Sequence, residues 1–126
     1  MIKKIIASSL IISFLTTPLF ASNYQKGYLQ GIDDAKENHS SLSWAIGSFL
    51  SIITVVGPVV CYVMADTDIF SEAPDVKPEF RSDFQYRTGY SQGYAKIAKS
   101  KNKKSVFRGA VFGISTWFVG YLKKHE

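Results

Sequence analysis

Two long apolar runs stand out along this chain. Residues 42–64 form a run of 23 residues without a charged side chain. Residues 106–122 form a run of 17 residues that is interrupted only by Arg108. At ~1.5 Å of rise per residue, the first run is long enough to cross the ~30 Å hydrocarbon core of a bilayer, and the second is marginal. The pattern predicts two transmembrane helices, with a buried or interfacial helix as the alternative for each run.

A short segment rich in tyrosine and glycine precedes each apolar run. The spacing of these residues places them on one face of a helix. Because glycine is a poor helix former, two glycines on one stripe indicate close approach of another backbone or ring. We expect this stripe to contact a partner or another copy, with packing on its own chain, or a loop, as the alternatives. The stripe residues are Tyr24, Gly27, Tyr28, Gly31, Tyr86, Gly89, Tyr90, Gly93 and Tyr94.

The second half of the chain repeats the first at an offset of 62 residues. Nine of the 34 residue pairs from 24/86 to 57/119 are identical, whereas ordinary composition gives about two. We therefore divide the chain into repeat unit 1 (22–64), an acidic, proline-containing loop (65–83), repeat unit 2 (84–122) and a basic tail (123–126). The predicted fold class is all-α, with a short striped amphipathic helix before each transmembrane helix.

The N-terminus and the charge distribution predict a topology. Residues 1–21 have the basic start, apolar centre and final alanine of a signal peptide, with an uncleaved anchor as the alternative. Residues 65–105 hold eight Lys/Arg, against two in 22–41. The positive-inside rule then places the loop in the cytoplasm and the exported N-terminus outside a bacterial cytoplasmic (inner) membrane. The two repeat units would be inverted, and their stripes would lie on opposite membrane faces, unable to touch within one chain.

Two further residue sets follow from this prediction. Lysines beside an apolar helix attract anionic headgroups, so we expect lipid contact from Lys99, Lys101, Lys103, Lys104 and Arg108. Nucleic acid is not expected, because lysine runs that flank such a helix usually signal topology. Small residues at helical spacing allow close helix crossing, so the expected helix-packing positions are Gly47, Ser51, Gly109, Gly113 and Gly120.

Candidate chemistry is sparse. The chain of 126 residues has a net charge of +5, two histidines and one cysteine, Cys61. These residues form no recognisable nucleophile set, zinc spacing or phosphate loop. A cation site could be drawn around Asp33 and Glu37, with Asp34 and His39 nearby, but a solvated polar face is the preferred interpretation. We therefore expect no enzyme, cofactor or metal.

The order of these elements resembles a group of small uncharacterised bacterial exported membrane proteins with two Tyr-x-x-Gly/apolar-helix repeats. The resemblance implies no particular activity. We expect a scaffold or accessory subunit that acts through helix–helix association, as a homo-oligomer or with a membrane-protein partner. The alternatives are an oligomeric pore or permeability factor, and a peripheral lipid-surface binder. The resemblance rests on Tyr28-x-x-Gly31-x-x-Asp34-Ala35, Pro58 with Cys61, Pro74 to Pro78, Tyr86-x-x-Gly89-Tyr90, and Lys99 to Lys104.

Overall fold

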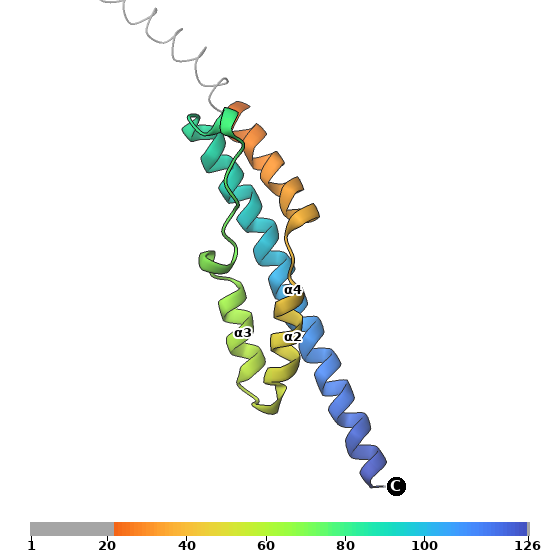
Figure 1. Cartoon of the computed structure of the whole chain (residues 1–126). Helices are drawn as coiled ribbons and strands as arrows, with labels where there is room; N and C mark the ends of the chain where they lie inside the picture. Colours follow the sequence, from red (N-terminus) through yellow and green to blue (C-terminus); the bar gives the residue numbers. More distant parts are fainter. Residues whose placement is uncertain (1–21, 126) are drawn as a thin grey trace, which may run out of the picture.

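The computed structural model describes residues 22–125, and all of the regular structure in that range is helical (Figure 1). The predicted signal peptide, residues 1–21, lies outside the described residues. Residues 22–38 are helical and are here named the N-terminal helix. The elements that follow are α2 (Leu42–Leu50), the 3-10 turn η1 (Ser51–Ile53), α3 (Gly57–Ala65), the 3-10 turns η2 (Asp68–Phe70) and η3 (Pro78–Phe80), and α4 (Phe84–Lys124).

The N-terminal helix lies alongside the first half of α4 and runs in the same direction (Figure 1). A side chain at Gly27 would collide with the backbone carbonyl oxygen of Tyr86. One turn further on, a side chain at Gly31 would collide with the carbonyl oxygen of Tyr90. Because the contact partners advance together along both helices, the two helices are parallel. Only glycine allows two backbones to approach this closely.

The reverse contacts repeat the same geometry. A side chain at Gly89 would meet the carbonyl oxygen of Tyr24, and one at Gly93 would meet that of Tyr28. Adding 62 to one residue number and subtracting 62 from the other converts each pair of the first set into a pair of the second. A pseudo-two-fold axis parallel to the helices therefore relates the two stripes. The prediction of inverted repeat units, with stripes on opposite sides of a membrane, is therefore wrong. The stripes pack on each other within one chain, and their glycines face backbone oxygens.

The first apolar run is a helical hairpin and not one long helix. Helix α2 ends at Leu50, η1 follows, and α3 begins at Gly57 and returns in the opposite direction (Figure 1). Pro58 occupies the first turn of α3, where its missing N–H group costs nothing and its fixed φ favours helix initiation. Proline within an apolar helical run favours a kink, whereas here the chain reverses completely just before Pro58.

The second apolar run is the C-terminal part of α4, a single helix of 41 residues. Across residues 22–125, no helix combines the length and the apolar character needed to cross a membrane. Each helix of the hairpin has nine residues, and the apolar part of α4 contains Arg108. The predicted transmembrane helices at 42–64 and 106–122 are therefore wrong. The integral-membrane function, the pore alternative and the inner-membrane localisation, which depended on them, are wrong as well.

The core of the molecule lies where the stripes meet. Ala35 and Ala98 are completely buried and pack with Tyr94, and Tyr86 and Tyr90 are buried beside them. These aromatic rings fill the space on either side of the glycine contacts, so the tyrosines supply the buried apolar area that the glycines lack. The two repeat units therefore share one small core.

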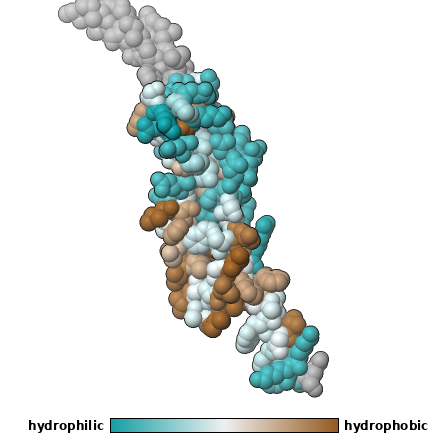
Figure 2. All heavy atoms as spheres, in the orientation of Figure 1, coloured by the Kyte–Doolittle hydropathy of each residue, from teal (hydrophilic) through white to brown (hydrophobic). Residues whose placement is uncertain are grey.

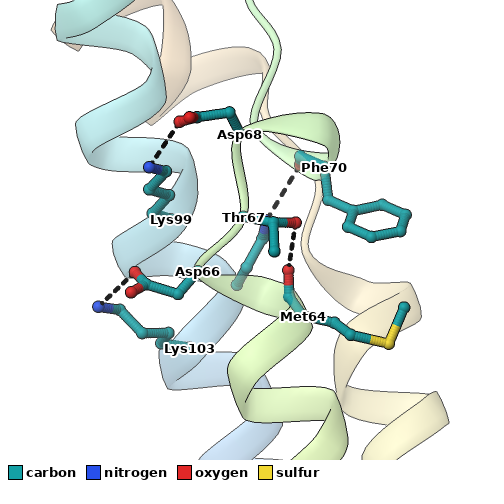
Figure 3. A network of polar contacts seen from close by, with 8 residues as sticks. Met64, Asp66, Thr67, Asp68, Phe70, Lys99 and Lys103 are labelled. Atoms are coloured by element: carbon teal, nitrogen blue, oxygen red, sulfur yellow. Dashed lines mark hydrogen bonds and ion pairs between the residues drawn. The ribbon is translucent and has the colours of Figure 1, made fainter.

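The acidic loop runs back along α4 and is held there by ion pairs (Figure 3). The Asp66 carboxylate lies 2.9 Å from the Lys103 ammonium, and Asp68 lies 2.6 Å from that of Lys99. The hydrogen bond with Lys103 lowers the pKa of Asp66, and the same hydrogen bond raises the pKa of Lys103. The charge segregation seen in the sequence thus attaches the loop to α4.

Candidate functional site

The molecule is divided along its length into a polar end and an apolar end (Figure 2). The apolar end comprises the whole helical hairpin, residues 42–65, and residues 106–122 of α4. Within the described residues, all large apolar side chains that are exposed lie in this end except Leu29, Ile69, Phe70 and Phe84. Such an extensive exposed apolar surface marks an interaction site in a folded protein.

The turn at the tip of the hairpin is its most exposed part. Ile53 is 90% exposed and Val55 is 92% exposed. Several polar groups of this turn are nevertheless hydrogen-bonded locally. The backbone N–H and the side-chain hydroxyl of Thr54 both donate to the Ser51 carbonyl oxygen at 3.0 Å, and the Gly57 N–H donates to the Thr54 carbonyl oxygen at 3.0 Å. This turn combines apolar exposure with internal hydrogen bonding, whereas turns in water usually present polar side chains.

Exposed apolar side chains surround the C-terminal part of α4. Trp117, Phe118 and Val119 are consecutive and all more than half exposed. Consecutive residues of a helix are ~100° apart around its axis, so these three side chains point in different directions. The exposed apolar surface of the site therefore faces several sides of the molecule.

A pair of basic residues marks the boundary of the apolar end. Lys104 and Arg108 lie one turn apart on α4, and both are exposed. None of the ion pairs within residues 22–125 involves either side chain. We name this pair the basic collar. Lys123 and Lys124 lie at the opposite limit of the same apolar segment, at the C-terminus of α4.

The other predicted lipid-contact residues have intramolecular partners. Lys99 and Lys103 pair with the acidic loop as described above. The Lys101 ammonium donates to the carbonyl oxygens of Ala35, Lys36 and His39 at 2.8 to 3.0 Å. Lys101 thereby satisfies the C-terminal carbonyls of the N-terminal helix and complements its dipole. Of the predicted five, Lys104 and Arg108 alone form no ion pair or ammonium hydrogen bond of this kind in the described structure.

The predicted helix-packing residues differ in what surrounds them. Gly109 allows α2 to approach closely, because a side chain there would collide with the Ala45 carbonyl oxygen. A Cβ atom at Gly113 would lie 2.7 Å from Cδ1 of Ile52. These two glycines therefore pack α4 against α2 and η1, which agrees with the role of small residues at close helix crossings.

The remaining packing candidates make no helix–helix contact of this type. No atom lies within 4 Å of an added Cβ at Gly47 or at Gly120. Ser51 acts within its own hairpin instead. Its hydroxyl donates to the Ser48 carbonyl oxygen at 3.0 Å and lies 3.8 Å from the Cys61 sulfur.

A buried polar seam joins the two repeat units where the N-terminal helix ends. The Asn102 side-chain amide donates to the Phe70 carbonyl oxygen at 3.2 Å, which leaves its Oδ1 as an acceptor for Nε2 of His39 at 2.8 Å. Nδ1 of His39 then accepts from the Tyr94 hydroxyl at 3.3 Å. Asn102 is completely buried. Sequence reasoning missed this seam, for which the one signal is an uncharged amide within a lysine run.

The stripe tyrosines form a second polar network. The Tyr90 hydroxyl donates to the Asp34 carboxylate at 2.9 Å, and the Tyr24 hydroxyl donates to the Gln92 side-chain oxygen at 2.6 Å. Burial raises the pKa of Tyr86, Tyr90 and Tyr94, and the Asp34 charge raises each of them further. Tyr90 is therefore a neutral structural donor, since its ionisation would place two negative charges side by side.

The residues considered for a cation site are dispersed. Asp33 pairs with Lys36 at 3.7 Å, while His39 lies in the polar seam. Within residues 22–125, no three His, Cys, Asp or Glu side chains are grouped so that they could hold a metal ion. The polar end thus offers hydrogen-bonded structure, and the exposed apolar end with its basic collar is the candidate functional site.

Comparison with known proteins adds no homologue. No protein-family model, curated protein or solved structure matches this chain. The resemblance to small bacterial exported proteins therefore remains an expectation from the sequence, and the functional argument rests on the geometry of the apolar end.

Proposed function

We propose that this chain is a non-enzymatic lipid-surface-binding protein that inserts its apolar end a short way into an anionic lipid surface without crossing it. The observation that carries the proposal is the hairpin turn, where Ile53 and Val55 are 90% and 92% exposed. Apolar side chains at a turn are unfavourable in water. They are favourable in an apolar medium, and internal hydrogen bonds lower the cost of placing the backbone there. Thr54 and Ser51 provide part of these bonds.

The dimensions of the hairpin support shallow insertion. Nine helical residues extend ~14 Å, about half of the ~30 Å hydrocarbon core. Basic side chains bracket the apolar part of α4, with the basic collar at one limit and Lys123 and Lys124 at the other. An oblique orientation lets both basic groups reach headgroups while the apolar residues between them enter the acyl boundary.

The distribution of apolar residues favours lipid over a second copy of the chain. A two-fold dimer covers one surface patch on each subunit. The exposed side chains of Trp117, Phe118 and Val119 point to different sides of α4, and the hairpin turn adds a further direction. Lipid acyl chains can surround all of these surfaces, whereas a single protein interface would leave some exposed.

The proposal is tested by placing a charge at the tip. Ile53→Asp should lower binding to sucrose-loaded phosphatidylglycerol/phosphatidylcholine vesicles by about tenfold or more, because burying such a side chain is worth ~1.5–3 kcal/mol. The matched control is Leu29→Asp, which changes an exposed apolar residue of the polar end and should bind like the parent. Co-sedimentation measures binding, and far-UV circular dichroism verifies that both variants retain their helices.

Two results would contradict lipid-surface binding. One is a parent chain that stays in the supernatant with every vesicle composition. The other is a stable oligomer in sedimentation velocity without lipid, which Ile53→Asp dissociates and which vesicles do not compete with. The second result would assign the apolar end to another copy of the chain.

A further inference from the structure

A cleft lies at the boundary between the apolar end and the polar end. It has a volume of 340 Å³ and is lined by Tyr62 of α3 and by Lys103, Lys104, Phe107 and Arg108 of α4. Three of its five lining side chains are cationic, and the other two are aromatic. This combination pairs a positively charged rim with ring surfaces.

The charges of the cleft are unequal in their availability. Lys103 is held by Asp66 at 2.9 Å, and its ammonium lies 6.0 Å from the centre of the Tyr62 ring. Lys103 therefore orders the wall of the cleft. Lys104 and Arg108 take part in none of the ion pairs formed among the described residues. Residues 84–125 contain no acid, so α4 itself supplies no competing carboxylate.

The chemistry of these side chains matches a phosphodiester anion. An arginine guanidinium can donate two parallel hydrogen bonds to phosphate oxygens, and a lysine ammonium adds a compact positive charge. Tyr62 and Phe107 are 49% and 67% exposed and provide ring surfaces for the less polar atoms next to a phosphate. The cleft also adjoins the apolar end. When that end is inserted into a lipid surface, the cleft lies at the depth of the headgroups.

We infer that this cleft is a binding site for the phosphate of an anionic phospholipid headgroup, with Lys104 and Arg108 as its donors. This inference rests on the proposed lipid-surface function, because a headgroup reaches the cleft only when the apolar end is inserted. It adds a defined site and a preference for anionic lipid to what apolar insertion alone would give.

The test compares two double variants of the full chain with equal loss of charge. Lys104→Gln/Arg108→Gln should weaken binding to phosphatidylglycerol-containing vesicles about 25-fold, since each basic residue at the surface contributes about fivefold. Its binding to pure phosphatidylcholine vesicles should fall much less, because the cationic choline neutralises the phosphate of that headgroup. Lys26→Gln/Lys77→Gln removes two exposed lysines outside the cleft and should change the affinity for either vesicle less than twofold.

The outcomes separate this inference from the function on which it rests. Suppose that the parent binds vesicles and Ile53→Asp does not, while both double variants bind phosphatidylglycerol vesicles as tightly as the parent does. Lipid binding then stands and the cleft assignment is overturned. If the two double variants lose affinity equally, the preference comes from net charge and the cleft is again overturned. If inorganic phosphate, at ionic strength matched with chloride, displaces the parent from phosphatidylglycerol vesicles, the cleft takes free phosphate. A parent that binds no vesicle overturns both proposals.

Discussion

Replacing Gly93 with alanine would add one methyl group where the two repeat units approach most closely. That Cβ would collide with the carbonyl oxygen of Tyr28, and both groups belong to helix backbones that cannot yield like a flexible side chain. Overpacking of this kind costs about 1–3 kcal/mol, and the upper part of the range applies to a rigid contact. Alanine recovers about 1 kcal/mol of helix propensity. We expect a net loss of about 2 kcal/mol.

This loss is measurable as a change in melting temperature. For a domain of this size, 1 kcal/mol corresponds to about 4 °C, so Gly93→Ala should melt roughly 8 °C below the parent chain by circular dichroism at 222 nm. Gly47→Ala and Gly120→Ala are matched controls, because nothing lies within 4 Å of the added atom. Their free energy of unfolding should equal that of the parent or exceed it by up to about 1 kcal/mol. A Gly93→Ala melting temperature equal to that of Gly120→Ala would refute the close parallel packing of the stripes.

Two further predictions concern the polar contacts. Lys101→Met should destabilise the chain by about 1–3 kcal/mol in urea unfolding, because three backbone carbonyls lose a charged donor. Lys104→Met should stay within ~0.5 kcal/mol, and equal effects of the two substitutions would contradict the capping role. The pKa of Tyr90 is raised by burial and by its hydrogen bond to Asp34. Its contribution to stability is therefore full below the ordinary tyrosine pKa of 10.0 and is lost as the pH rises through the folded-state pKa. Above pH 10 the folded chain should show less phenolate absorbance at 295 nm than the urea-unfolded chain, and Tyr90→Phe should reduce this difference. Superimposable titration curves of the folded and unfolded chains would disprove the raised pKa.

Local features of the sequence carried much of the correct information. The spacing of Gly27, Gly31, Gly89 and Gly93 identifies surfaces where another backbone comes close, since each glycine sacrifices helix propensity. Pro58 marks a discontinuity in the first apolar run, because proline lacks a donor for the preceding turn. The concentration of lysine on α4 is equally visible. In each case the property belongs to a residue and its near neighbours, so periodicity and composition reveal it.

The topology prediction failed because it assumed that every apolar run crosses a membrane. Hydropathy along residues 42–64 is the same for a spanning helix and for a hairpin. The choice depends on whether the chain can reverse with its polar groups satisfied, and the local hydrogen bonds at Thr54 and Gly57 allow this. Because the chain reverses within the first apolar run, the predicted placement of the loop and of the second repeat unit relative to a membrane no longer follows.

Sequence patterns alone identify a helical chain with two matching striped surfaces, an apolar half and a basic segment. The partners of these features follow only from the fold. Gly93 faces Tyr28, Lys103 faces Asp66, and His39 faces Asn102, across separations of 37 to 65 residues in the sequence. The physical reason is that helical periodicity reports which side chains share a face. Which faces meet depends on contacts between distant segments, and these also decided which cations, Lys104 and Arg108, were left without an acidic partner in the described structure.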